Sequence, residues 1–111
     1  MTRALLIPAD PNKAIEILEV AGLESLQEQV GGYIEGLSLP CGLFAYINAE
    51  GKFIDLPRNS RADKLLRELD VRLASDDCIA GNMLVLGAVD EGGEDTDFPE
   101  RLVNQFVSVL G

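Results

Sequence analysis

The chain has 111 residues, of which 47% are hydrophobic and 25% are charged, a composition that favours one folded domain over residues 1–111 and excludes a disordered acidic tail. Its formal net charge is −10, and it has no histidine, which excludes Ser-His and Cys-His catalysis and the commonest metal ligand. No apolar run approaches the ~18–20 residues of a membrane span, and the N-terminal run is too short for a signal peptide. We therefore expect a cytoplasmic protein that makes no membrane contact.

The first third of the chain predicts two strands and a helix. The segment ALLIPAD, residues 4–10, is typical of a short buried strand that ends at Pro8, because proline supplies no backbone donor. Apolar residues alternate imperfectly in AIEILEV, residues 14–20, which favours a second strand joined to the first by a hairpin. The segment 23–32, LESLQEQVGG, predicts a short helix that ends at Gly31.

Residues 33–55 predict three antiparallel strands. The segments YIEGLSLP and LFAYINAEGKFI alternate in hydrophobicity and are separated by turn residues. We expect Gly51 to adopt a positive φ in a turn over NAEGK. That turn would form a hairpin that pairs Phe44 and Tyr46 with Phe53 and Asp55.

A second helix is predicted in the middle of the chain. The apolar stripe Ala62, Leu65, Leu66 and Leu69 has helical spacing, and Asn59 or Ser60 suits the N-cap. Asp63, three residues after Ser60, resembles the acid of a capping box.

The last third of the chain predicts a central strand, a loop and a final helix. The segment 78–89, CIAGNMLVLGAV, is apolar on both alternations, which indicates a strand that is buried on both faces. Residues 90–100 read as an acidic loop. A helix follows, with Asp97 and Glu100 at its cap and third positions. Its expected apolar face is Leu102, Val103, Phe106 and Val107. The fold class is therefore α+β, a mainly antiparallel sheet covered by two or three helices.

The two cysteines and the high apolar content indicate how the chain packs and whether it associates. In a cytosolic chain, Cys41 and Cys78 are expected to be buried small hydrophobes rather than a disulfide, and neither has a metal-ligand companion at suitable spacing. So much apolar surface in so small a domain favours a homo-oligomer.

Basic residues are concentrated in one window of the chain, residues 52–72. Six of the nine basic residues lie there against four acids, while the rest of the chain carries 15 acids and three bases. The fork of an arginine and the free amides of a helix start can together hold a phosphate or carboxylate. The predicted ligand-binding residues are Arg58, Asn59, Arg61 and Lys64, with Tyr33 or Glu35 for a base or ribose. The alternative is a solvated helix with the i, i+4 pairs Asp63–Arg67 and Lys64–Glu68.

The acidic loop is the second candidate interaction site. The segment DEGGEDTDFPE has six acids and no base, and its glycines do not match a calcium-binding loop, so we expect a solvated or partner-facing negative patch. The residues assigned to a partner are Asp90, Glu91, Glu94, Asp95 and Asp97. Direct nucleic-acid binding is disfavoured because the rest of the surface repels phosphate.

The glycines form neither a P-loop nor a dinucleotide motif, and no cofactor or metal site is expected.

The order of several short motifs resembles a known family. They are LIPADP, GGYIEGLSL, YINAEGK, LPRNSRADKLL and IAGNMLVLGAVDEGG. With these motifs the chain resembles small proteins of actinobacterial phages and mobile elements that are known only as a domain of unknown function. The positions that carry the resemblance are Gly32, Ile34, Glu35, Asn48, Glu50, Gly51, Asn59, Ala62, Gly81 and Gly87.

The resemblance implies an accessory protein that counters the host, and the family offers no activity to carry over. An enzyme is disfavoured by the residues themselves, because the chain has no histidine, no metal constellation and no nucleophile in a recognisable setting. The leading hypothesis is a non-enzymatic protein that binds and sequesters a phosphate-bearing small molecule, such as a nucleotide signal. The alternative is an acidic inhibitor or DNA mimic that binds a host defence or regulatory protein through the loop at residues 90–100. Both rest on analogy with other small acidic phage proteins.

Overall fold

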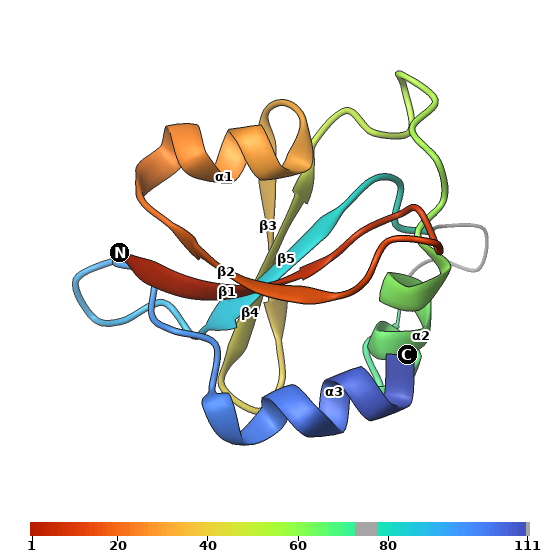
Figure 1. Ribbon diagram of the computed structural model, residues 1–111. Coiled ribbons are helices and arrows are strands. Elements are labelled where there is room, and N and C mark those ends of the chain that lie inside the picture. The colour runs from red at the N-terminus through yellow and green to blue at the C-terminus, as the bar shows by residue number, and fades with distance from the viewer. Residues whose placement is uncertain (73–77, 111) are drawn as a thin grey trace.

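The computed structural model describes residues 1–72 and 78–110, which form one antiparallel sheet flanked by helices (Figure 1). The elements in chain order are β1 (Thr2–Ile7), β2 (Glu16–Val20), α1 (Gly22–Val30), β3 (Ile34–Leu39), β4 (Leu43–Asn48), α2 (Ser60–Glu68), β5 (Met83–Gly87), the 3-10 turn η1 (Glu100–Leu102) and α3 (Val103–Leu110). The strand order is β2-β1-β5-β4-β3. This arrangement confirms the predicted α+β class. Among the described residues, no helix is long and apolar enough to cross a bilayer.

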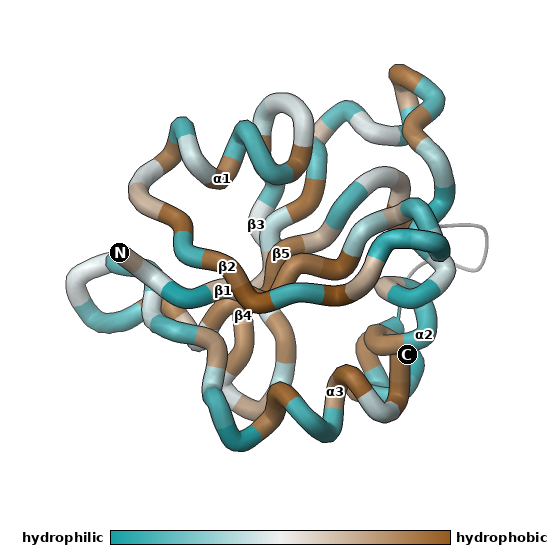
Figure 2. The backbone as a smooth tube through the Cα atoms, in the orientation of Figure 1, coloured by the Kyte–Doolittle hydropathy of each residue, from teal (hydrophilic) through white to brown (hydrophobic). Residues whose placement is uncertain are grey.

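The strand β5 lies at the centre of the sheet, between β1 and β4, as its sequence predicts. All five of its residues are buried, because side chains on both of its faces are covered by helices. Figure 2 shows the hydrophobic residues concentrated along these central strands. The predicted hairpin of β1 and β2 is also confirmed, with Leu5 opposite Ile17.

The helices cover the two faces of the sheet unequally. The helix α1 packs on one face of the sheet. The small core between them consists of Ala4, Leu6, Val20, Leu26, Val30, Leu84 and Leu86. The helices α2 and α3 cover the larger core on the opposite face, which includes Leu5, Ile7, Leu65, Met83, Val85 and Phe106. The two cores make a three-layer arrangement in which α1 lies on the opposite side of the sheet from α2 and α3 (Figure 1).

Both predicted helix boundaries in the first two thirds of the chain are confirmed. The helix α1 ends at Gly31, which adopts a left-handed conformation with φ of 81°. The helix α2 starts after Asn59, whose side chain accepts a hydrogen bond from the backbone N–H of Ala62. Asp63 does not complete a capping box, because its carboxylate binds Arg58 and Ile79 instead.

The predicted hairpin over residues 44–55 is wrong. Residues 49–55 form turns, and β4 pairs with β3 on one side and β5 on the other, so a third local strand has no free edge to join. Gly51 does not have a positive φ. It is required for a close approach instead, since a Cβ there would lie 2.6 Å from the carbonyl oxygen of Ala80.

The final helix forms, but its start differs from the prediction. Asp97 does not cap it, because its carboxylate accepts a 2.8 Å hydrogen bond from the backbone N–H of Arg3. The chain turns at Pro99, forms η1 and then enters α3. Leu102 and Phe106 are buried as expected, whereas Val107 is 42% exposed and Leu110 takes its place in the core.

The prediction of two buried cysteines is also wrong. Cys41 is exposed in the tight turn between β3 and β4, where its φ is 65°. Cys78 is half-buried, and neither cysteine is in a disulfide in the described part of the chain.

Candidate ligand-binding site

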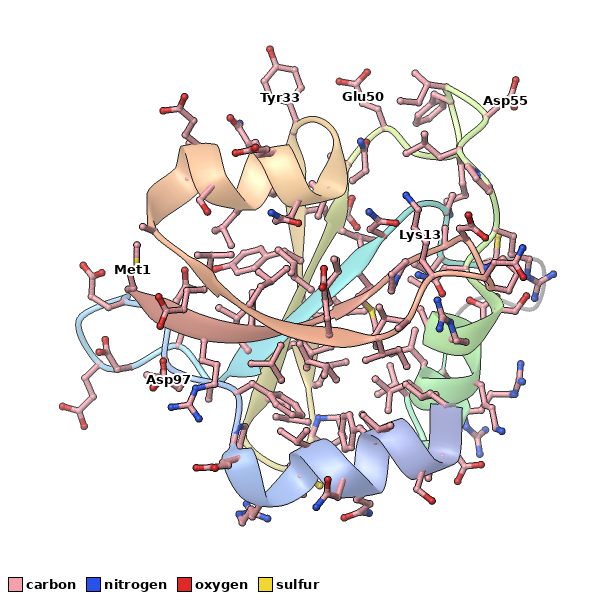
Figure 3. The ribbon with its side chains drawn as sticks, viewed as in Figure 1. Met1, Lys13, Tyr33, Glu50, Asp55 and Asp97 are labelled. Carbon is pink, nitrogen blue, oxygen red and sulfur yellow. The ribbon has the colours of Figure 1, made fainter. Side chains whose placement is uncertain are left out.

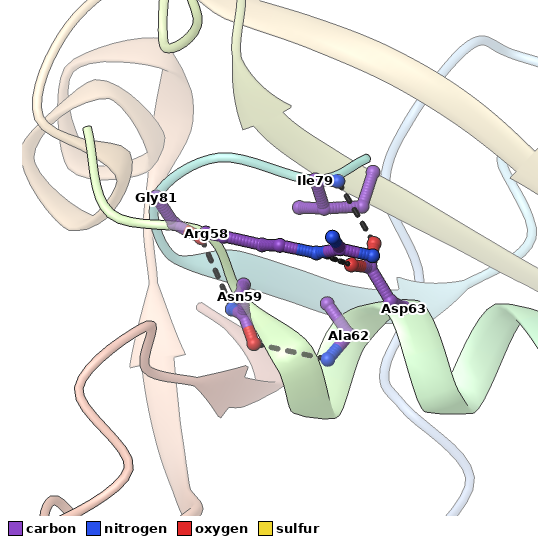
Figure 4. A network of polar contacts seen from close by, with 6 residues as sticks. All are labelled: Arg58, Asn59, Ala62, Asp63, Ile79 and Gly81. Carbon is purple, nitrogen blue, oxygen red and sulfur yellow. Dashed lines mark hydrogen bonds and ion pairs between the residues drawn. The ribbon is translucent and has the colours of Figure 1, made fainter. Parts of the chain in front are cut away.

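The start of α2 is tied to the sheet through Asn59 (Figure 4). Its side-chain amide donates hydrogen bonds to the carbonyl oxygens of Ile7 (2.8 Å) and Gly81 (3.0 Å), and its Oδ1 accepts one from the N–H of Ala62 (2.9 Å). Asn59 has no exposed surface. Its assignment as a ligand-binding residue is therefore corrected: Asn59 positions the site, and a ligand does not reach it.

Asp63 holds Arg58 beside this helix start. The Asp63 carboxylate is buried and accepts a 2.7 Å hydrogen bond from Nε of Arg58 and a 2.9 Å hydrogen bond from the N–H of Ile79. The hydrogen bond and charge of Asp63 raise the pKa of the Arg58 guanidinium above its usual range. The Arg58 side chain is still 63% exposed. It therefore presents a fixed positive group at the surface.

The predicted basic residues do not all converge. Arg61 turns toward the connection between β1 and β2, where it donates hydrogen bonds to the carbonyl oxygens of Pro8 (2.8 Å) and Asp10 (2.9 Å). Lys64 is exposed on α2. Arg58 shares an open pocket of about 240 Å³ with Arg67, which was not in the predicted site; Ser60 and Asp63 complete its lining. Arg67 could have been found from sequence, since it lies two helical turns after the cap.

A larger cavity of about 440 Å³ lies beside β3 and β4, on the face of the sheet that α2 and α3 cover. Its apolar lining comes from Leu37, Ile47, Ala49, Phe53, Cys78, Ile79 and Ala80. Glu35 contributes a carboxylate, and Asn48, Gly51 and Lys52 contribute the remaining lining. Of the two predicted base-binding residues, Glu35 thus lines the cavity. Tyr33 does not line it: its side chain is 70% exposed and points away from the body of the molecule (Figure 3).

The cavity and the arginine pocket have no lining residue in common, but residues 78–80 link them. Cys78, Ile79 and Ala80 line the cavity, while the N–H of Ile79 binds Asp63, which lines the pocket. The backbone of Arg58 also forms a β-bridge with Ala80. Gly51 lies so close to this segment that a Cβ there would be 2.6 Å from the carbonyl oxygen of Ala80.

The acidic loop is largely engaged in its own structure. Asp90 accepts hydrogen bonds from the N–H groups of Gly92 and Glu94, both 2.9 Å long. Asp95 accepts a 2.5 Å hydrogen bond from the hydroxyl of Tyr46, and Asp97 binds Arg3. Of the five acids assigned to a partner, Glu91 and Glu94 are the exposed pair whose side chains make no such bond in the described part of the chain.

Among residues 1–72 and 78–110, no three side chains of the metal-binding types His, Cys, Asp or Glu come together as a possible metal site. The arginines of the pocket and the lining of the cavity are side chains that could contact a ligand.

The fold and site define an α+β protein with a ligand-sized cavity next to an arginine-lined pocket. Residues 1–111 match the model of the family described as Domain of unknown function (DUF3846), and the chain belongs to that family. Neither the comparison with curated proteins nor that with solved structures finds a match.

Proposed function

We propose that this protein is a non-enzymatic binding protein that sequesters a small molecule with a planar group and a phosphate. The observation that carries the proposal is that residues 78–80 link the cavity beside β3 and β4 to the pocket of Arg58 and Arg67, since Ile79 lines the cavity and its N–H binds Asp63 of the pocket. A ligand that spans both sites would place its planar group against apolar walls and its anionic group against two guanidinium groups.

The cavity suits a planar group with polar edges, such as a nucleobase. Leu37 and Ile47 supply apolar surface, and Phe53, which is 88% exposed, supplies a ring for stacking. The carboxylate of Glu35 accepts hydrogen bonds, so it would favour a ligand whose edge carries N–H donors.

The pocket suits an anion. An arginine guanidinium carries five N–H donors, and Asp63 takes the one on Nε of Arg58. Asp63 thereby orients the group without covering it, since most of the Arg58 side chain stays exposed. Arg67 adds a second positive charge on the following turns of α2.

The biological setting follows from the resemblance to phage and mobile-element proteins. In that setting the protein would act in the cytoplasm of a host cell and lower the concentration of a nucleotide signal that the host uses. This part of the proposal is supported by the resemblance alone.

The test is calorimetric titration of the intact protein with a panel of linear and cyclic nucleotides and their unphosphorylated nucleosides. We expect binding of a phosphorylated member and at least about tenfold weaker binding of its nucleoside, since each charge-assisted contact contributes strongly. The double variant Arg58→Gln, Arg67→Gln should weaken phosphate binding by a similar factor, while Arg101→Gln, an exposed arginine on η1, is the matched control.

The cavity has its own variant. Phe53→Ala should weaken binding of the nucleotide and of its nucleoside by about the same factor, roughly tenfold, because stacking involves the base and not the phosphate. Val107→Ala, which shortens an exposed apolar residue far from the cavity in sequence, is the control. If no nucleotide binds, or if both arginine and Phe53 variants bind as wild type does, the proposal is wrong.

A second function is favoured by Glu91 and Glu94, which are exposed on a turn that Asp90 holds in shape. A rigid acidic turn of this kind could bind a basic surface of a host protein or mimic DNA. Glu91→Gln with Glu94→Gln should then abolish capture of the host protein, and capture should fall steeply as salt is raised.

A further inference from the structure

The strand β3 is an edge of the sheet, so half of its backbone N–H and C=O groups have no neighbouring strand to bond. The N–H of Ala49 donates a 2.8 Å hydrogen bond to the carbonyl of Tyr33 just before the strand. In an antiparallel pair, alternate residues bond the neighbouring strand, so Glu35, Leu37 and Leu39 bond β4. The N–H and C=O groups of Ile34, Gly36 and Ser38 therefore face away from the sheet.

This edge has few of the features that keep edge strands apart: β3 contains no lysine or proline, and its one charge is Glu35. Proteins usually protect exposed edges with lysine, proline, a bulge or inward-pointing charge. Residues 33–49, which contain β3 and β4, include a single charged residue, Glu35, in a chain of net charge −10. The other edge strand, β2, carries Glu16 and Glu19 within five residues. Self-association of so acidic a protein requires a locally neutral surface, and β3 provides one.

We propose that two copies of this protein form a dimer by antiparallel pairing of their β3 strands about a twofold axis at Gly36. A twofold axis requires a surface that complements itself. In this register Gly36 faces Gly36 of the second copy, and Ile34 faces Ser38 of the second copy. Each outward N–H then meets an outward C=O, and the sheet continues through both copies.

Gly36 makes the centre of this interface compact. A Cβ at Gly36 would lie 2.7 Å from the ring of Phe44, which covers the glycine from the face that carries α1. The aromatic ring thus replaces the missing side chain on the edge strand. No side chain at the axis keeps the two backbones apart.

The dimer would also complete the cavity. Glu35 and Leu37 line it from β3, and in the proposed register Glu35 lies opposite Leu37 of the second copy. Tyr33, which directly precedes β3 and is 70% exposed, lies opposite Leu39 of the second copy if the pairing extends by one residue. The second β3 therefore extends the apolar wall of the cavity beyond the edge of one chain. Dimer formation is measured without ligand, so it does not depend on the function proposed above.

The experiment is sedimentation equilibrium of the full chain over micromolar concentrations. We expect a monomer–dimer equilibrium in wild type. Ser38→Pro removes an N–H that points away from β4, so the fold should persist. The dimer dissociation constant should rise about tenfold or more, because the twofold axis places the substitution in the interface twice and two hydrogen bonds are lost. Circular dichroism checks that the variant is folded.

The matched control is Ile17→Pro on the opposite edge. The carbonyl of Arg3 accepts a hydrogen bond from the N–H of Phe98, on the side of β1 that faces away from β2. Since alternate residues of a strand bond the same neighbour, the N–H and C=O groups of Leu5 also point to that side, toward β5. Ile17, opposite Leu5, then directs its N–H away from the sheet, and its replacement should leave the dimer unchanged.

Glu35→Gln should lower the dimer dissociation constant, whereas Ser38→Pro should raise it. The two Glu35 side chains would be diagonal neighbours about 7–8 Å apart across the axis, so removing their like charges should tighten the dimer. The proposal is overturned if wild type stays monomeric at all concentrations, if folded Ser38→Pro dimerises as wild type does, or if Glu35→Gln weakens the dimer.

Discussion

The buried carboxylate of Asp63 accepts a 2.9 Å hydrogen bond from the backbone N–H of Ile79, which lies 16 residues further along the chain. This contact joins the first turn of α2 to the segment that separates the cavity from the arginine pocket. Since Asp63 is 6% exposed, its loss would leave the Ile79 N–H without its acceptor in a buried place.

Asp63→Ala should lower the free energy of unfolding by about 2–4 kcal/mol, because it removes a buried hydrogen-bonded charge and leaves a buried donor. Urea denaturation measures the change. Arg58→Gln is the comparison, and we expect it to have a small effect because the Arg58 side chain is mostly exposed. Equal losses in the two variants would show that the ion pair, and not the bond to Ile79, is what matters.

Asn59→Ala should cost about 3 kcal/mol, the sum of a lost N-cap and two lost hydrogen bonds to buried carbonyl groups. Asn59→Ser retains the cap acceptor and should recover about 1 kcal/mol of that loss. Chemical denaturation of both variants separates the cap from the bonds to Ile7 and Gly81. A loss below about 1 kcal/mol in Asn59→Ala would contradict this account.

Gly51→Ala should destabilise the protein by about 1–3 kcal/mol, because the new Cβ would meet the backbone oxygen of Ala80 and force the two segments apart. Gly92→Ala is the matched control. Its Cβ would have one neighbour, Oδ1 of Asp90 at 3.4 Å, and its φ is not in the left-handed region. Thermal unfolding of both variants tests the prediction, which fails if they unfold at the same temperature.

Tyr46 should make stability fall in alkaline solution. Burial, followed by the hydrogen bond to Asp95, raises the pKa of its hydroxyl well above the ordinary value of 10.0. Above pH 10 the unfolded chain therefore releases a proton that the folded chain retains, and stability falls as pH rises. Below pH 10 both states hold the proton, so this loss is absent.

The measurement compares wild type with Tyr46→Phe from neutral to alkaline pH. The difference in unfolding free energy between the two should change by at most about 1.4 kcal/mol per pH unit above pH 10, with wild type losing more. Groups other than Tyr46 titrate in both proteins and cancel in the difference. Parallel curves for the two proteins would show that Tyr46 has an ordinary pKa.

Several elements follow from local patterns in the sequence. The run of apolar residues at 83–87 predicts a strand buried on both faces, and β5 is the central strand. The stripe at Ala62, Leu65 and Leu66 predicts α2, and these three residues are buried. Such patterns are reliable because burial of one face imposes a period on the residues of the segment itself.

The roles of polar residues were less predictable. Asp63 resembles an ordinary acid in the first turn of a helix, yet its partner is Ile79; Asp97 resembles a cap, yet it binds Arg3 from the opposite end of the chain. Hydrogen-bond partners of this kind depend on which distant segments meet. The same reason explains the missed turns at 49–55, since the pairing of β4 with β5 occupies the edge that a local hairpin would use.

The sequence by itself determined the α+β class, most of the helices and strands, and the concentration of basic residues in one window. Only the tertiary structure decided that Arg58 and Arg67 share a pocket while Arg61 binds the β1–β2 connection, and that Glu35 lines a cavity. Periodicity records whether a residue faces the core, whereas a binding site depends on the distances between residues far apart in the chain. Those distances are set by the order of strands in the sheet and by the packing of helices on it.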